Sequence, residues 1–260
     1  MPDRQVVLRL WRTNGSNGDG RSGRFDEARV AADPGRDTVL DVIERAWALV
    51  DRTLVFRHAC HHASCGTCAV RVDGRERLPC ITGLGEVWDG HSALTIEPLR
   101  NSPTIRDLAS DPSPTIARLA SLRLPYVRTV ESDVRAASGV AADDDVGAAE
   151  RFEDCIECLA CVSACSVASG DPEYLGPAVL AAADRIVEEP RHQDSERILD
   201  LVNGEHGVWQ CRSVWACSAV CPSGVDPAGR IMKLRRRLLF GEEGGVAAIP
   251  SSSAHLGVGA

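Results

Sequence analysis

Residues 155–165 read CIECLACVSAC, and residues 211–221 read CRSVWACSAVC. The two stretches are copies of one motif, because both follow the pattern C-x2-X-x2-C-x3-C and they begin 56 residues apart, at Cys155 and Cys211. Position X is Cys158 in the first copy and Val214 in the second. A thiolate donor in one copy is therefore a hydrocarbon in the other, so the two copies differ in the number of metal ligands they offer.

The spacing of this repeat is typical of two-cluster ferredoxins, in which three closely spaced cysteines hold one iron–sulfur cluster and the fourth ligates the other. Under this exchange one site receives four thiolates, which match a 4Fe–4S cluster. These are Cys155, Cys158, Cys161 and Cys221. The other site receives three thiolates, with Val214 in place of a fourth, so its expected cofactor is a 3Fe–4S cluster. These are Cys165, Cys211 and Cys217.

A third group of cysteines lies nearer the N-terminus, with the spacing C-x4-C-x2-C-x11-C of plant-type 2Fe–2S ferredoxins. Soft, negatively charged thiolates suit iron–sulfur clusters. Gly66, between the second and third cysteines, leaves room for the backbone to approach a compact cluster, because glycine lacks a side chain. The expected cofactor is a 2Fe–2S cluster. Its predicted ligands are Cys60, Cys65, Cys68 and Cys80.

Other uses of cysteine fit less well. Zinc sites usually pair two C-x2-C halves, whereas the group at Cys60 has one. Disulfides fit poorly with eleven cysteines, an odd number, and with residues 1–11, which have no apolar stretch of signal-peptide form. A Rieske centre replaces two cysteines by histidines. Four cysteines already complete this set, so the nearby histidines are interpreted as solvated loop residues. They are His58, His61 and His62.

Length and charge restrict the class of protein further. The 260 residues suffice for about two domains. A net charge of −8 argues against a general nucleic-acid binder, because phosphate contacts need clustered positive charge. The longest stretch without charged side chains, residues 244–260, lacks the density of Leu, Ile and Val of a membrane helix. We expect a chain that is soluble by itself and reaches a membrane through a partner or a surface.

Hydrophobic periodicity in the first hundred residues indicates a β-grasp order of elements. Alternation predicts strands at 6–11 and 25–31, and further strands are expected at 69–72 and 93–97, with a turn at residues 73–74. Thr38 and Asp41 form a predicted capping box before apolar residues at helical spacing up to Val50. The first cysteine loop follows this helix.

The remainder of the chain reads as short helices flanked by cysteine loops. Residues 105–124 carry helical apolar spacing broken by Pro112 and Pro114, and helices are expected at 177–188, 195–202 and 227–240. The predicted domains are a 2Fe–2S domain (1–100), connecting helices and an acidic linker (101–150), a helical dicluster domain (151–240) and a disordered tail (241–260). The fold class is α+β, with an N-terminal β-grasp domain and a C-terminal all-α, bacterial-ferredoxin-like domain.

The order of the three cysteine groups resembles that of the iron–sulfur subunit of succinate dehydrogenase and fumarate reductase, over about residues 4–240. The motifs that carry the resemblance are CHHASCGTC (60–68), LPC (78–80), EPL (97–99), IRDL (105–108), CIEC (155–158), GP (176–177) and CPSGVDP (221–227).

The resemblance implies a subunit of an oxidoreductase of the tricarboxylic acid cycle and respiratory chain. Such a subunit relays electrons from the FAD of a flavoprotein partner through 2Fe–2S, 4Fe–4S and 3Fe–4S clusters to quinone at a membrane-anchor subunit. It implies that no residue of this chain is catalytic or binds succinate. It also implies a peripheral position on the cytoplasmic side of the cell membrane, reached through partner subunits, with the quinone near the 3Fe–4S cluster.

Two departures from the family pattern concern the quinone. Well-known members have a tryptophan shortly after the cysteine matching Cys165 and a histidine after the one matching Cys211. Here residues 166–174 contain no tryptophan, and Arg212 takes the histidine position. Arg212 and Trp215 are therefore the candidate residues of a quinone vicinity, and a solvated or salt-bridged Arg212 is the alternative interpretation.

Three alternatives to succinate oxidation remain open from the sequence. Fumarate reductase has the same architecture and catalyses the reverse reaction. Ligand spacing does not distinguish the two directions. A freestanding ferredoxin-like carrier would be stable alone. The iron–sulfur subunit of another disulfide- or hydroxyacid-linked redox complex would commonly carry two complete four-cysteine repeats, and Val214 argues against it.

Overall fold

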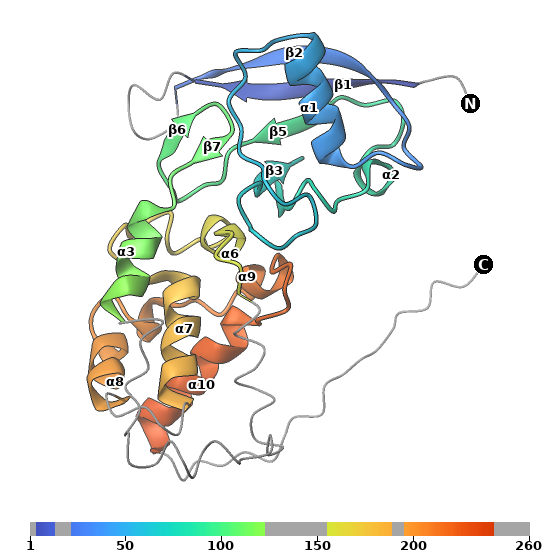
Figure 1. Cartoon of the computed structure of the whole chain (residues 1–260). Coiled ribbons are helices and arrows are strands. Elements are labelled where there is room, and N and C mark those ends of the chain that lie inside the picture. The colour runs from blue at the N-terminus through green and yellow to red at the C-terminus, as the bar shows by residue number, and fades with distance from the viewer. Residues whose placement is uncertain (1–3, 14–21, 123–154, 189–194, 242–260) are drawn as a thin grey trace, which may run out of the picture.

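The computed structural model describes residues 4–13, 22–122, 155–188 and 195–241. Figure 1 shows two parts: a sheet with a helix against it, formed by the first half of the chain, and a group of short helices formed by the second half. The predicted linker (131–150) and the predicted tail beyond Gly241 lie outside the described residues.

The first part is built on a five-stranded sheet of strand order β2-β1-β5-β3-β4. The central strand β1 pairs antiparallel with β2 and parallel with β5. The strand bounds are β1 Arg4–Arg12, β2 Arg24–Ala32, β3 Val70–Val72, β4 Arg75–Arg77 and β5 Leu94–Glu97. Because a strand presents alternate residues to one face, β1 buries Val6, Leu8 and Leu10 against the core.

Helix α1 (Val39–Leu49) covers this sheet, as Figure 1 shows. The predicted capping box is confirmed: Thr38 Oγ1 accepts a hydrogen bond from the Asp41 backbone N–H, and the Asp41 carboxylate accepts one from the Thr38 N–H. Val42 and Ile43 pack into the sheet core. Two strands, a helix and then a strand parallel to the first form the predicted β-grasp arrangement.

The helical spacing read from Ile105 onward is wrong for the first part of that segment. Residues Thr104–Arg106 (β6) and Ala109–Ser110 (β7) form a two-stranded hairpin, and helix α3 (Ser113–Ser121) begins only after Pro112. The hairpin is held to the first part because Leu108 packs in its core, and the buried Asp107 carboxylate accepts backbone N–H groups of Thr13 and Val55, both at 2.9 Å.

The second part is helical, and the three helices predicted at 177–188, 195–202 and 227–240 are confirmed, each bound within one residue. Helix α7 is its centre: nearly all of its residues are buried, as expected of a helix that is apolar on every side. It packs against α10, α8 and α3. The element bounds are α6 Ala160–Ser163, α7 Gly176–Glu188, α8 Ser195–Asn203, η2 Val208–Gln210, α9 Ala216–Ala219 and α10 Pro227–Phe240.

The short elements α2 (Leu84–Val87) and β4 were not predicted, because each is only three or four residues long. The turn expected at residues 73–74 joins β3 to β4, with positive φ at Asp73 (45°) and Gly74 (80°), as type I′ hairpin turns require. Among the described helices, none has the length and apolar character needed to cross a membrane.

Candidate iron–sulfur sites

The two copies of the cysteine repeat have the same backbone conformation. In the first loop Glu157 and Leu159 have positive φ angles of 51° and 65°, and the residues 56 positions later, Ser213 and Trp215, have 54° and 65°. Each loop then enters a one-turn helix, α6 or α9. Left-handed residues are uncommon outside glycine, so four at matching positions mark one structural unit used twice.

The first site of the second part is a cavity with an apolar lining that includes four cysteines and Pro222. The four are Cys155, Cys158, Cys161 and Cys221. Burial, and then the nearby thiols Cys221 and Cys155, raise the pKa of Cys158 to about 11. Burial also raises the pKa of Cys161. Crowded, desolvated thiols resist losing protons unless a cation is bound among them, so this donor set fits a cluster of positively charged irons.

A buried arginine side chain stabilises the loop beside this site. Arg230 donates from Nε to the Val225 carbonyl (3.0 Å) and pairs through Nη1 with Asp184 Oδ2 (3.2 Å). Val225 in turn donates its backbone N–H to Cys221 Sγ at 3.4 Å. Burial raises the pKa of Asp184 to about 7, and Arg230 acts in the opposite direction. Arg230 therefore fixes the loop that presents Cys221.

The second site brings Cys165 from the first copy to Cys211 and Cys217 of the second. Burial, followed by Cys165 and Cys211, raises the pKa of Cys217 to about 11. Burial, followed by the charges of Cys211 and Cys165, raises the pKa of the buried Tyr174. Val214, the counterpart of Cys158, is 65% exposed. At the position of a fourth ligand this site therefore has neither a thiol nor a buried side chain.

The third site is the loop that follows α1. Cys68 and Cys80 are buried with their Sγ atoms 3.5 Å apart, and Cys60 and Cys65 are half-buried. Thr67 Oγ1 lies 3.2 Å from Cys65 Sγ and lowers the pKa of that thiol to about 6. Burial raises the pKa of Cys68 to about 12. Hydrogen bonds to the outer thiols and burial of the inner ones are consistent with four thiolates around a 2Fe–2S cluster.

At Gly66 the loop that carries Cys60, Cys65 and Cys68 approaches the loop that carries Cys155 and Cys158. Gly66 has a φ of +66°, and a Cβ added to it would lie 2.4 Å from the Ile156 carbonyl oxygen and 3.0 Å from Cys158 Cα. The sequence assigned Gly66 to close approach between backbone and cluster; the close approach in the structure is to the neighbouring cysteine loop. Cys68 and Cys80 also share one buried apolar cluster with Leu159.

Asn101 fastens the two parts of the chain beside these loops, and sequence reasoning missed it. Its Nδ2 donates to the carbonyls of Val162 (2.8 Å), Ser163 (3.2 Å) and Cys165 (2.9 Å). Ser163 Oγ in turn donates to Glu76 Oε1 of the first part at 2.7 Å. Asn101 has a φ of 59°, a conformation in which asparagine is enriched, but its carbonyl partners are distant in sequence.

The candidate quinone residues lie on the loop of the second copy. Arg212 is exposed and Trp215 is 47% exposed. The structure adds Arg235, which sequence reasoning did not place at this site. Its guanidinium donates to the carbonyls of Val208 (2.9 Å) and Cys211 (2.5 Å), so it holds the backbone that presents Cys211.

The fold and the three thiol sites define an iron–sulfur protein in which a plant-type ferredoxin domain is joined to a two-site ferredoxin-like domain. Family models support this class: a 2Fe-2S iron-sulfur cluster binding domain matches residues 7–117, and a 4Fe-4S dicluster domain matches residues 151–225.

Two relatives identify the family within this class of iron–sulfur proteins. The fumarate reductase iron–sulfur subunit of Mycobacterium tuberculosis is 35% identical, covering 80% of this chain and 86% of that protein. The succinate dehydrogenase iron–sulfur subunit of Paracoccus denitrificans is 30% identical, covering 85% and 83%. The chain belongs to the family of fumarate reductase and succinate dehydrogenase iron–sulfur subunits.

A solved structure has the same fold. A chain of the Mycobacterium smegmatis Sdh1 complex in the apo form matches with a TM-score of 0.79 and 24% identity, covering 91% of this chain and 96% of that one. The α+β fold class with iron–sulfur domains, and the resemblance read from the cysteine order, are therefore confirmed.

Proposed function

We propose that this chain relays electrons from the FAD of a flavoprotein subunit through 2Fe–2S, 4Fe–4S and 3Fe–4S clusters to a quinone at a membrane anchor, in the direction of succinate oxidation. The proximity of its three thiol sites along the chain's interior carries the proposal. Gly66 adjoins the loop of Cys158, and the charge of Cys217 acts on the pKa of Cys161. When bound, iron–sulfur clusters accept and release single electrons.

The chain's own part in this function is to hold and space the cofactors. The proposed 2Fe–2S ligands are Cys60, Cys65, Cys68 and Cys80; the 4Fe–4S ligands are Cys155, Cys158, Cys161 and Cys221; and the 3Fe–4S ligands are Cys165, Cys211 and Cys217. We assign no catalytic residue and no succinate contact to it. The domain boundaries near residues 100, 150 and 240 stay a prediction.

The three-iron assignment predicts that Val214→Cys completes a set of four thiolates. Since Val214 has the backbone position of Cys158 in the repeat, the new thiol needs no loop rearrangement. We expect the EPR signal of the oxidised three-iron cluster to disappear and the iron content to rise by about one per chain. Val214→Ser, of similar size and without a thiol, is the control. An unchanged three-iron signal in a fully loaded Val214→Cys protein would contradict the assignment.

We place the quinone beside the second site, the proposed 3Fe–4S site. Its loop exposes three large apolar side chains next to Cys211 and Cys217: Trp209 (44%), Val214 (65%) and Trp215 (47%). Exposed apolar groups gathered on one segment mark interaction surfaces, and a membrane anchor with its quinone is the partner proposed for this one. Arg212 lies in the same segment. The complex would then sit on the cytoplasmic side of the cell membrane.

Fumarate reduction is the second candidate, favoured by the 35% identity to a protein of that name. One experiment distinguishes the functions. The tagged chain is isolated from detergent-solubilised membranes, its partners are identified by mass spectrometry, and the complex is assayed in both directions. We expect a flavoprotein and an anchor subunit, with faster succinate-dependent quinone reduction. Faster fumarate reduction would reverse the direction, and a monodisperse chain without partners would support a freestanding carrier.

A further inference from the structure

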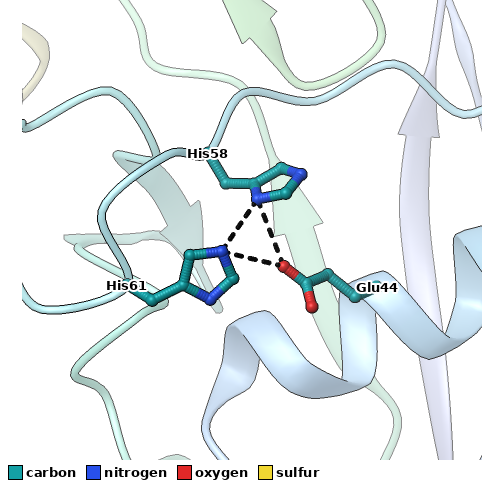
Figure 2. Close-up of side chains that lie close together, drawn as sticks. All are labelled: Glu44, His58 and His61. Atoms are coloured by element: carbon teal, nitrogen blue, oxygen red, sulfur yellow. Dashed lines mark hydrogen bonds and ion pairs between the residues drawn. The ribbon is translucent and has the colours of Figure 1, made fainter.

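Three side chains outside the cysteine sites converge at the edge of the first cysteine loop. Figure 2 shows Glu44, from α1, facing His58 and His61. His58 Nδ1 lies 3.2 Å from Glu44 Oε1, His61 Nε2 lies 3.5 Å from the same oxygen, and the two nitrogens are 3.1 Å apart. All three histidines are exposed loop residues, as the sequence interpretation expected, but His58 and His61 also face a carboxylate.

No hydrogen bond within this group satisfies the Oε1 atom of Glu44. Glu44 Oε1 is inaccessible to solvent and has no hydrogen bond of acceptable geometry, although two ring nitrogens lie within 3.5 Å of it. Two N–H groups also cannot point at each other across 3.1 Å, so at most one of the facing nitrogens carries a proton. Oε1 of Glu44, Nδ1 of His58 and Nε2 of His61 therefore face one another, and a bound cation would satisfy all three atoms.

The size of this triangle matches one face of a tetrahedral metal site. Zinc binds histidine nitrogen and carboxylate oxygen at about 2.0–2.2 Å, so donor atoms in tetrahedral arrangement lie about 3.3–3.6 Å apart. Of the three separations in the structure, 3.5 Å lies within this range, and 3.1 and 3.2 Å lie within about 0.2 Å of it. Octahedral ions at about 2.1 Å would need separations near 3.0 Å.

The surrounding residues hold the donors in place. The His58 ring stacks on Phe56 with centroids 5.1 Å apart, and Phe56 packs against Trp47 of α1. His61 has a φ of 61° and directly follows Cys60. Glu44 projects from α1, whose backbone is hydrogen-bonded. A side-chain exposure of 31–46% leaves a path for an ion and for a water ligand.

We propose that Glu44, His58 and His61 bind one divalent transition-metal ion of the zinc class, with water in the fourth position. Two histidines and one carboxylate are a common zinc donor set. The ion would tie α1 to the loop of Cys60 and Cys65 and would bring positive charge next to the 2Fe–2S cluster proposed there. Zinc binding is measured independently of electron transfer. The zinc proposal can therefore be refuted while the proposed function holds.

The test uses the anaerobically purified complex with full iron content. It is incubated with Zn²⁺, passed through a desalting column and analysed for zinc and iron by mass spectrometry. We expect about one zinc per chain. His58→Ala, His61→Ala and the nearly isosteric Glu44→Gln should each lower zinc affinity at least about tenfold without loss of iron. His62→Ala, a neighbouring exposed histidine outside the triangle, is the matched control and should retain zinc.

A second measurement separates this site from vacated cysteine sites. Zinc bound at Glu44 should raise the midpoint potential of the 2Fe–2S cluster in the wild type and in His62→Ala, and not in Glu44→Gln. Absence of retained zinc in the iron-replete wild type, or equal retention in Glu44→Gln, would overturn the proposal. If a histidine variant loses iron, Glu44→Gln decides.

Discussion

Cys221→Ala is expected to convert the 4Fe–4S cluster into a second three-iron cluster. By the proposed exchange, Cys221 completes the site formed by Cys155, Cys158 and Cys161, although it belongs to the other copy of the repeat. Removing it leaves three thiolates, the number that the second site already has. We expect the EPR signal of the reduced four-iron cluster to vanish, the oxidised three-iron signal to integrate to about twice its wild-type intensity, and total iron to fall from about nine to about eight per chain.

Cys165→Ala is the matched control, because it removes the last cysteine of the other copy. Its site keeps only Cys211 and Cys217, too few to hold a cluster, so the three-iron signal should disappear and iron should fall to about six per chain. The four-iron signal should remain. If Cys165→Ala removed the four-iron signal and Cys221→Ala the three-iron signal, each copy would hold its own cluster and the exchange would be refuted.

Gly66→Ala is expected to separate the proposed 2Fe–2S and 4Fe–4S sites. An added Cβ would lie 2.4 Å from the Ile156 carbonyl oxygen, and both atoms belong to backbones that cannot rotate away. The left-handed backbone at Gly66 also costs a non-glycine residue about 1–2 kcal/mol. We expect lower thermal stability and a large slowing of electron transfer between the 2Fe–2S and 4Fe–4S clusters, measured by rapid-freeze EPR after flash reduction.

Gly74→Ala provides the control for backbone strain. Gly74 has a similar φ of +80°, but its nearest neighbour to an added Cβ is the end of the Arg71 side chain at 3.6 Å. It should lose similar stability from backbone conformation and keep the wild-type transfer rate. If the two variants transferred electrons equally fast, contact at Gly66 would not set the spacing of the sites.

What could be predicted from the sequence depends on whether the signal is local. The cysteine loops are local motifs, and the structure groups their thiols as the spacing predicts. Helix α10 was predicted with the right bounds because Asp226, Pro227 and Gly241 mark its ends. The hairpin at Thr104–Ser110 was read as helical, because its strand character comes from packing Leu108 into a distant core.

The contacts that assemble the sites could not be predicted in the same way. Asn101 and Arg235 act on carbonyl groups 61 and 24 residues away in sequence, and carbonyls carry no residue-specific signal. His58 and His61 were noted, together with His62, as loop histidines. Glu44 joins two of them only because the β-grasp fold brings the second turn of α1 next to the loop. Functional residues that only the tertiary structure brings together can be identified only from coordinates.

The crossed arrangement of Cys165 and Cys221 makes the repeated loops mutually dependent. Deleting either loop would withdraw a donor from both cofactors, so a gene encoding one half could not support even a single intact centre. Substitution at an interior position, as at Val214, alters the metal stoichiometry of one centre and leaves the other untouched. Such an architecture allows each centre to be tuned separately by point substitution, whereas loss of a whole loop would disable both.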